Sequence, residues 1–404
     1  MNHFYEPKSR RLAHVIADRR GLQYPYPLRR ENTMRVCRMF HMALRGAGCL
    51  LTFVVLMGGI NGCSPKDMKE EKPKAPRGSI ILRGAGATFP AWLYERWFEV
   101  YQNDHPKTVI SYDRIGSGEG TRRFIGKNVK EEDRVDFGAS DAAMNDEDID
   151  QVPNGAVLLP MTAGGVVLAY NLPDLEGDLK LSRKAYAGIF LGEIKNWNDP
   201  AIAITNPGLK LPRIPIATVV RQDKSGTTYA FTKHLDAISE KWRVQQGPTT
   251  LLSWPGNSLW AKGDEGVATL IKQSSGSLGY VSYAFASRLG LKLAVLENKE
   301  GKFVKPTQQS CTAALATAEM PEILRIFVPD PSGLDAYPIV TFSWILLYKD
   351  YPDTEMATSI RDLFQWCLLD GQNYATKLGY VPLPTSITEK ALATLNTVGP
   401  RERL

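Results

Sequence analysis

Histidine and cysteine are scarce in this chain of 404 residues, with five of each. Six of these ten side chains come before residue 64, at His3, His14, His41, Cys37, Cys49 and Cys63. Catalytic triads and first-row metal sites usually need more imidazole than His105 and His234 can supply, so we expect no catalytic residue, metal or cofactor. Cys367 lies on the apolar side of an expected helix, which favours a buried free thiol, although pairing with Cys311 stays open.

An excess of basic charge is also lacking once the first 62 residues are set apart. Those residues hold ten of the 49 Lys and Arg but only three of the 43 Asp and Glu. The other 342 residues therefore carry 39 basic and 40 acidic side chains. A protein that binds nucleic acid needs a basic face, so we expect no nucleic acid among the partners.

The N-terminal segment contains a short apolar run rather than a membrane span. Leu50–Met57 follows basic residues and precedes small ones, as in an export signal, and is too short to cross a bilayer comfortably. The next residues, Ile60-Asn61-Gly62-Cys63, resemble a bacterial lipobox, in which the cysteine is lipidated. We therefore predict a signal peptide over residues 1–62 and a lipid anchor at Cys63.

The start of the signal peptide is better placed at Met34 than at Met1. The distance from Met34 to Cys63 is the usual length of such a signal. We expect residues 1–33 to be a mis-called start or an unusually long basic region.

The rest of the chain is expected to form two lobes behind a tether. After Cys63, residues 63–78 are rich in Lys, Glu and Pro and have no hydrophobic period, as in a flexible tether. Beyond them strand-like and helix-like runs alternate, which favours parallel sheets covered by helices on both faces. The length exceeds what one core usually serves. We predict one lobe from residues 79–171 and 340–404 and a second from 172–339.

Short patterns predict the local elements. Strands are expected at 79–82, 108–112, 135–139, 156–160, 165–170, 214–220 and 340–348. Thr88 is a candidate N-cap for a helix with Pro90 in its first turn, and Asp141 is a candidate cap after the strand at 135–139. Gly116–Gly120 is expected to be a turn before a helix that begins at Thr121.

The stretch Arg221–Thr228 carries the strongest chemical signal. An arginine ends a strand, and hydroxyl and glycine residues begin a helix. The first N–H groups of a helix have no internal partner, and the helix dipole adds positive charge there, so the turn is suited to an anion. An ordinary capped helix with a surface arginine explains the stretch alone equally well.

Similar turns occur at Thr88 and Ser117, each where a strand gives way to a helix. Ligands of open α/β sheets bind beyond the carboxyl ends of the strands, so the three turns can meet in one cleft. Dinucleotide, P-loop, kinase and nucleophile-elbow motifs are incomplete; Gly84-Ala85-Gly86, for example, lacks the third glycine of a dinucleotide fingerprint. The turns and Arg221 together predict a site for a small tetrahedral oxyanion.

Seven motifs resemble those of the phosphate-binding proteins that serve bacterial phosphate-specific ABC transporters. In family order they are Gly84–Pro90, Ile115–Ser117, Val135–Asp141, Gly164–Ala169, Phe190–Trp197, Asn206–Pro212 and Arg221–Thr227. The resemblance runs from about residue 80 to the C-terminus. It implies a type II periplasmic-binding-protein fold, α/β with two lobes and mixed, mostly parallel sheets. It also implies a lipid-anchored periplasmic protein that closes around inorganic phosphate and delivers it to permease subunits and their ATPase.

The resemblance further implies which residues bind the ligand. They are Thr88, Phe89, Ser117, Asp141, Arg221, Ser225, Gly226 and Thr227. Asp223 would hold Arg221 in place. The chain departs from the commonest family form at Glu119, which we expect to point to solvent, and at Lys224, which would strengthen the positive field.

Asp141 needs a physical reason, because a carboxylate repels an anion. Hydrogen phosphate can donate its proton to an ionised Asp141, whereas sulfate has none to donate. An unpaired buried carboxylate against sulfate costs several kcal/mol, which gives discrimination.

Two alternatives stay open: a binding protein for another oxyanion such as sulfate or molybdate, and a phosphatase or phosphoryl-transfer enzyme. In the first, Asp141→Asn leaves ligand preference unchanged. The second predicts ester hydrolysis that Ser225→Ala abolishes.

Overall fold

The computed structural model describes residues 77–316 and 318–401 of the chain. All of them belong to one compact unit, Glu71–Leu404. The predicted signal peptide, Cys63 and all but the last two residues of the predicted tether lie outside the described residues. Within the described part, no helix has the length and hydropathy that a membrane crossing requires.

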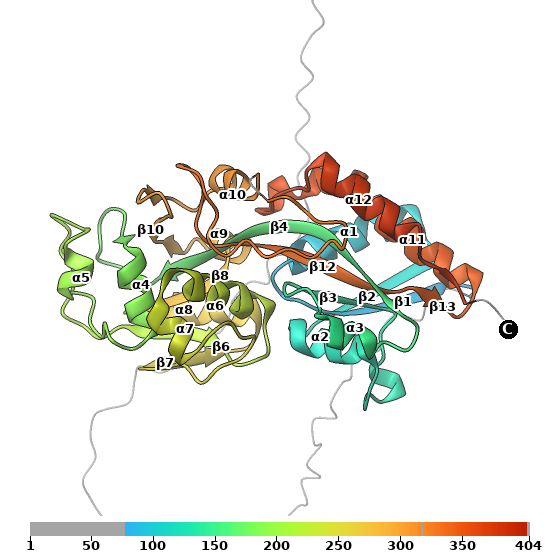
Figure 1. Ribbon diagram of the computed structural model, residues 1–404, viewed down its shortest axis with the longest axis horizontal. Coiled ribbons are helices and arrows are strands. Elements are labelled where there is room, and N and C mark those ends of the chain that lie inside the picture. The colour runs from blue at the N-terminus through green and yellow to red at the C-terminus, as the bar shows by residue number, and fades with distance from the viewer. Residues whose placement is uncertain (1–76, 317, 402–404) are drawn as a thin grey trace, which may run out of the picture. The chain divides into compact units, whose positions relative to one another are not determined.

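Strands and helices alternate along most of the described chain, as predicted (Figure 1). The strands are β1 (Ile80–Gly86), β2 (Thr108–Arg114), β3 (Phe137–Ser140), β4 (Ala156–Tyr170), β5 (Lys180–Leu181), β6 (Ala217–Arg221), β7 (Ser258–Ala261), β8 (Ser277–Ser282), β9 (Lys292–Leu293), β10 (Val295–Glu297), β11 (Phe303–Val304), β12 (Val340–Tyr348), β13 (Asp350–Tyr351) and β14 (Gly399–Pro400). The helices are α1 (Ala91–Asp104), α2 (Ser117–Ile125), α3 (Asp146–Asp150), α4 (Arg183–Phe190), α5 (Pro200–Ala203), α6 (Gly226–Ile238), α7 (Glu240–Gln245), α8 (Gly263–Gln273), α9 (Tyr283–Arg288), α10 (Gln308–Leu315), α11 (Thr354–Leu368) and α12 (Thr385–Leu395). Short 3-10 turns, η1 (Glu131–Asp133), η2 (Asp370–Tyr374) and η3 (Thr376–Leu378), join some of them.

The main sheet has the strand order β2-β1-β3-β12-β4-β8-β6-β7, with β9 beside β4. Its pairs are parallel at both ends, where β1 pairs with β2 and β3, and β6 pairs with β7 and β8. In the middle, β12 and β4 run antiparallel to their neighbours. The predicted mixed sheet is confirmed, with its parallel pairs at the two ends and its antiparallel pairs in the middle. Parallel pairs also join β5 to β10 and β13 to β14 in the two smaller sheets.

Strand β4 belongs to both halves of this sheet. Residues 156–165 pair with β12, and from Val166 the strand pairs with β8 instead. We predicted two short strands here, and the structure has one continuous strand. Pro160 cannot donate to a ladder, and a register irregularity between Ser343 and Trp344 lies opposite it. β4 changes its pairing partner between Gly165 and Val166, which is before the predicted lobe boundary at residue 171. The lobe boundaries at residues 171 and 340 therefore stay predictions.

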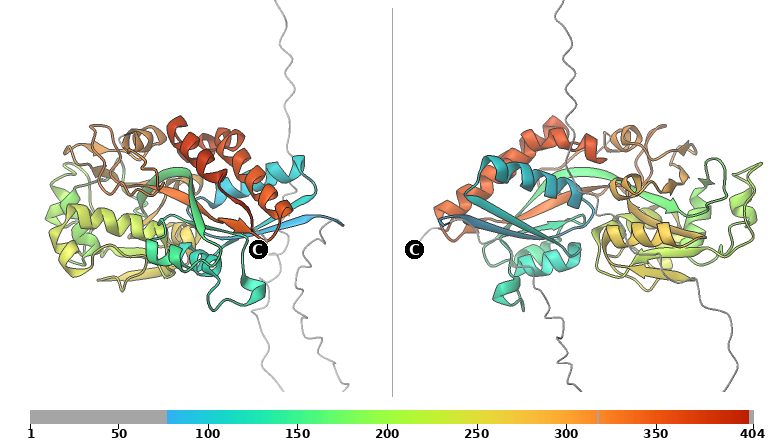
Figure 2. Two further views of the ribbon diagram at one scale, coloured as in Figure 1. Left: turned by 45° about the vertical axis from the view of Figure 1, so that its right-hand side comes forward. Right: turned by 180° about the vertical axis from the view of Figure 1, so that it is seen from behind.

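Helices cover both faces of the β1–β3 half of the sheet. Helices α1, α11 and α12 lie on one face and α2 and α3 on the other, and the view from behind shows the same arrangement (Figures 1 and 2). Aromatic side chains fill this core; Phe137 packs edge-on against both Phe98 and Phe364. Both faces of the sheet are therefore buried, which leaves the strand ends as the places where polar groups can gather.

Candidate functional site

The Arg221 turn has the predicted geometry. Strand β6 ends at Arg221, and helix α6 begins at Gly226. Ser225 is the N-cap, and its hydroxyl oxygen accepts the N–H of Thr228 at 3.1 Å. Among the described residues, the N–H groups of Gly226 and Thr227 have no hydrogen-bond partner. Two backbone donors at the positive end of a helix of 13 residues are thus available to an anion.

Arg221 is buried between two carboxylates. Its Nε and Nη2 donate to the two oxygens of Asp223 at 2.9 and 2.5 Å, and its Nη1 donates to Oδ2 of Asp264 at 2.7 Å. Burial opposes the charge, but the bond to Asp223 and the charges of both carboxylates raise the pKa of Arg221 above its ordinary value. Of the five N–H donors of an arginine, two remain.

Asp264 is the central residue that our sequence reasoning missed. It lies in the first turn of α8, directly after Gly263, whose φ of +66° favours glycine. Its carboxylate accepts from the hydroxyls of Thr88 (2.7 Å) and Thr227 (3.3 Å) and from the N–H of Ser282 (2.9 Å). The strand β7 leads into this helix, so a fourth strand-to-helix turn was the signal available in the sequence.

Thr88 does not cap a helix, and that prediction is wrong. The N-cap of α1 is Pro90, and no side chain caps this helix. The hydroxyl of Thr88 instead donates to Asp264 and accepts the N–H of the same residue at 3.1 Å. The ring of Phe89 is buried, and its carbonyl accepts from Tyr380 at 2.8 Å. The N–H of Phe89 has no partner within residues 77–316 and 318–401.

Ser117 begins helix α2, four residues earlier than we predicted. Its hydroxyl oxygen accepts the N–H of Asp141 at 3.2 Å. The side chain of Glu119 in the same turn is 35% exposed and pairs with Arg122 and Arg123. The hydrogen bond from Arg122 is the largest cause that lowers the pKa of Glu119 to about 2. Its charge is therefore neutralised locally.

Asp141 is 1% exposed and follows strand β3. It does not cap a helix, because α3 begins at Asp146 with Asn145 as its N-cap. The hydroxyl of Ser343 on β12, a residue absent from our predicted set, donates to its Oδ1 at 2.8 Å. Burial raises the pKa of Asp141 to about 7; the Ser343 hydroxyl opposes the rise and the charge of Asp264 adds to it.

The two halves of the sheet meet at these turns. A Cβ at Gly226 would lie 2.7 Å from backbone atoms of Asp141 and Ala142, so α6 lies directly against the end of β3. The N–H of Gly118 donates to the carbonyl of Lys224 at 3.0 Å. Bonds and contacts thus link Asp223 with most of the predicted binding residues, and Phe89 and Ser225 adjoin these residues in the chain. Their role in binding stays a prediction.

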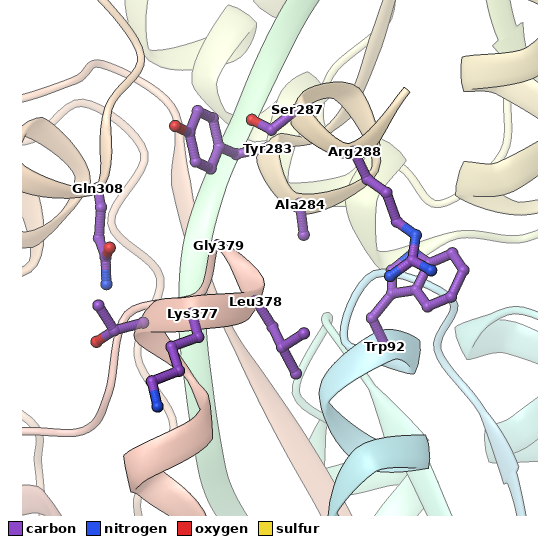
Figure 3. Close-up of a pocket in the computed structure, with 10 residues that line it drawn as sticks. Trp92, Tyr283, Ala284, Ser287, Arg288, Gln308, Lys377, Leu378 and Gly379 are labelled. Atoms are coloured by element: carbon purple, nitrogen blue, oxygen red, sulfur yellow. The ribbon is translucent and has the colours of Figure 1, made fainter. Parts of the chain in front are cut away.

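Lys224 and Ser117 also line a cavity of about 680 Å³ that opens beside the site. Lys224 is exposed and carries its positive charge at the wall of this cavity. A separate pocket of about 390 Å³, drawn in Figure 3, lies between α1, α9 and η3. There Arg288 lies over the ring of Trp92 at 3.8 Å, and none of the predicted binding residues lines the pocket.

The two cysteines and the buried histidine of the described chain are not among the residues of the candidate site. Cys311 and Cys367 are both buried free thiols, so they form no disulfide with each other. His234 is buried, with its ring bonded to Tyr186 and to the carbonyl of Pro329. No group of three or more His, Cys, Asp or Glu within the described part of the chain has an arrangement suited to a metal ion.

Comparisons with known proteins place the chain among anion-binding proteins. A family model described as a PBP superfamily domain matches residues 71–370. The phosphate-binding protein PstS of Pasteurella multocida is 38% identical over 319 residues, which cover 78% of this chain and 90% of the relative. PstS of Haemophilus influenzae is 39% identical over 309 residues, 76% of this chain and 90% of the relative.

A solved structure gives an independent likeness of fold. The periplasmic phosphate-binding protein PfluDING, solved with phosphate bound, matches 80% of this chain and 100% of its own. Its TM-score is 0.65 and its sequence identity 22%.

Proposed function

The chain belongs to the PstS family of phosphate-binding proteins and has their α/β fold, and on that premise we propose that it binds inorganic phosphate between two lobes. The single observation that carries the proposal is the contact of Gly226 with Asp141. It brings the free N–H groups of α6 beside a buried carboxylate. The relatives are named as binding proteins, which supports a receptor over a phosphatase.

The available donors suit a tetrahedral oxyanion. Arg221 keeps two N–H groups after its bonds to the carboxylates, and the N–H groups of Phe89, Gly226 and Thr227 are unpaired among the described residues. The hydroxyls of Ser117 and Ser225 lie in the same set of turns. Hydrogen bonds to a charged group contribute about 1.5–3 kcal/mol each, so a few of these donors are enough for tight binding.

Asp141 is the proposed source of selectivity. Its carboxylate is buried, and when ionised it accepts a hydrogen bond from the P–OH group of hydrogen phosphate but repels sulfate, which has no hydrogen to donate. Because its pKa is about 7, it is ionised in part at neutral pH and fully above it. Discrimination against sulfate should therefore increase as the pH rises through 7.

We further propose how the receptor is placed and used. Residues 1–62 act as an export signal, Cys63 carries a lipid and residues 63–78 form the tether in the periplasm. The lobes, residues 79–171 with 340–404 and residues 172–339, close by a hinge motion, and the closed form delivers phosphate to permease subunits driven by their ATPase. The lipobox-like Ile60-Asn61-Gly62-Cys63 and the family membership support this assignment.

Isothermal titration calorimetry with phosphate and with sulfate tests the proposal. At pH 8 the purified wild-type protein should bind phosphate and discriminate against sulfate by about 100-fold or more. Asp141→Asn should bind sulfate at least tenfold better than the wild type, because an amide can donate to it. Asp150→Asn, an exposed position on α3, removes the same charge and should change neither affinity. A wild-type protein that binds no phosphate, or binds both anions equally, contradicts the proposal.

A further inference from the structure

Asp264 is a second buried carboxylate in the proposed phosphate site. It is 1% exposed, like Asp141, and reaches the site from α8. Its Oδ2 oxygen accepts from Thr88, Thr227 and Arg221, and its Oδ1 accepts from the backbone of Ser282. Each carboxylate oxygen has about two acceptor positions, so the three donors on Oδ2 already exceed what that oxygen can accept.

Three of those donors belong to residues that the proposed function assigns to phosphate. A threonine hydroxyl has one hydrogen, and Thr88 gives it to Asp264 at 2.7 Å. The hydroxyl of Thr227 points to the same oxygen at 3.3 Å. Neither hydroxyl can donate to a bound anion without leaving Asp264. The carboxylate and the ligand therefore compete for the same hydrogens.

The charges around Asp264 do not favour a dianion. Arg221 supplies one positive charge, and Asp223 and Asp264 supply two negative ones in direct contact with it. Asp141 faces this group from the end of β3, and the phenols of Tyr280 and Tyr380 also lie near it. Without Asp141 the group already carries about one net negative charge.

We propose that Asp264 is a specificity-determining residue: its carboxylate competes with the bound anion for the hydroxyls of Thr88 and Thr227, and its charge favours monobasic over dibasic phosphate. This inference rests on the proposed phosphate function. Two consequences follow. Binding weakens as the pH rises through the second ionisation of phosphate, and complex formation above that pH takes up a proton.

The decisive variant is Asp264→Asn, compared with Glu265→Gln. Asparagine keeps the shape and one acceptor oxygen but removes the charge. Glu265 is the next residue of α8, its side chain is 60% exposed, and it pairs with Arg114 at 3.4 Å. Its substitution removes the same charge outside the site, where solvent screens it.

Calorimetric titration with inorganic phosphate from pH 6 to 8.5 gives the readout. At pH 8, Asp264→Asn should bind on the order of tenfold more tightly than the wild type, since a unit charge a few ångströms away is removed. At pH 6 the gain should be about twofold, so the pH profile becomes flatter. Glu265→Gln should follow the wild-type profile. Equal or weaker binding by Asp264→Asn, with a profile parallel to that of the wild type, overturns the inference.

The wild-type protein provides a measurement that does not depend on the variant's folding. Titrations at pH 8 in buffers of different ionisation enthalpy count the protons exchanged on binding. We expect net uptake by the wild type, reduced in Asp264→Asn where that variant folds; no uptake by the wild type contradicts the inference. If the wild type and Glu265→Gln bind no phosphate at all, the proposed function itself has failed. If they bind and only these comparisons fail, the role of Asp264 alone is wrong.

Discussion

Asp141 and Asp264 are both 1% exposed, yet their surroundings differ strongly. The carboxylate of Asp141 accepts a hydrogen bond from the hydroxyl of Ser343 and is repelled by the like charge of Asp264. Burial is the largest cause that raises its pKa to about 7. The carboxylate of Asp264 accepts hydrogen bonds from the guanidinium of Arg221, from two threonine hydroxyls and from a backbone N–H. Burying a charge is costly unless it is paired and hydrogen-bonded. The difference indicates that the carboxylate of Asp264 is fully engaged by its neighbours, whereas the carboxylate of Asp141 keeps acceptor positions for a ligand.

The largest expected effect comes from removing Arg221, the cation that pairs with Asp264 and with Asp223. Arg221→Ala leaves Asp223 and Asp264 without their partner in a buried place, which should cost about 3–5 kcal/mol of unfolding free energy. Chemical denaturation measures it. Arg183 makes a similar two-bond pair with Asp330, but its side chain is 25% exposed, so Arg183→Ala should cost only about 1 kcal/mol. Equal losses of unfolding free energy in Arg221→Ala and Arg183→Ala would contradict the prediction that the buried pairs of Arg221 matter more.

The second expected effect is the pH dependence of stability that Asp141 causes. Its folded-state pKa of about 7 exceeds the ordinary value of 3.8, so the folded protein keeps a proton that the unfolded chain has lost. Stability should therefore fall as the pH rises from about 4 to about 7, by roughly 4 kcal/mol at most. His234 acts in the opposite direction, because burial lowers its pKa to about 4.

The contribution of Asp141 is isolated by comparison with Asp141→Asn, in which His234 is unchanged. In the absence of phosphate, the difference in unfolding free energy between this variant and the wild type should shift in the variant's favour between pH 4 and 7 and then level off. The Asp150→Asn control should show no such trend. A constant difference over this range would mean that Asp141 titrates normally.

The sequence predicted local features of the site well and long-range pairs poorly. The strand end at Arg221 and the start of the helix at the hydroxyl and glycine residues that follow depend on neighbouring residues, and both lie as expected. Thr88 looked like a helix cap because the same hydroxyl serves either purpose, but its partner Asp264 is 176 residues away. No local sequence pattern predicts a hydrogen bond between residues so far apart in the chain, because only the folded structure brings them together.

Gly120 shows a second reason for error. The sequence around it contains three glycines in five residues, which is typical of a turn. In the structure it lies inside helix α2, where a Cβ would come within 2.3 Å of Gly86 Cα. The glycine permits close packing of the helix on β1, a need that arises only in three dimensions.

Gly226→Ala should have the third largest effect, a loss of phosphate affinity, because it pushes helix α6 away from Asp141. A Cβ there would meet the backbone of Asp141 and Ala142 at 2.7 Å, and backbone cannot move aside. Overpacking of this kind costs about 1–3 kcal/mol, so phosphate affinity should fall by roughly 5- to 150-fold if the whole cost opposes binding. Helix α6 itself tolerates alanine. Gly266→Ala on α8, with nearest atoms at 3.5 Å, is the matched control for calorimetry. Unchanged affinity in Gly226→Ala would mean that the halves need not meet during binding.

The smallest expected effect tests the hydroxyl of Ser343, which donates to the carboxylate of Asp141. Ser343→Ala removes a hydrogen bond to the ionised form, worth about 1 kcal/mol, and should raise the pKa of Asp141 by somewhat under one unit. A protonated Asp141 can donate to sulfate, so the preference for phosphate should be lost at a correspondingly higher pH than in the wild type. Competition titrations of phosphate against sulfate from pH 5 to 9 measure this midpoint. Thr341→Val removes a buried hydroxyl that donates to the backbone carbonyl of Asp141 instead, and should leave the midpoint in place. A shift shared by both variants, or a shift to lower pH, would show that the hydroxyl of Ser343 does not set the ionisation of Asp141.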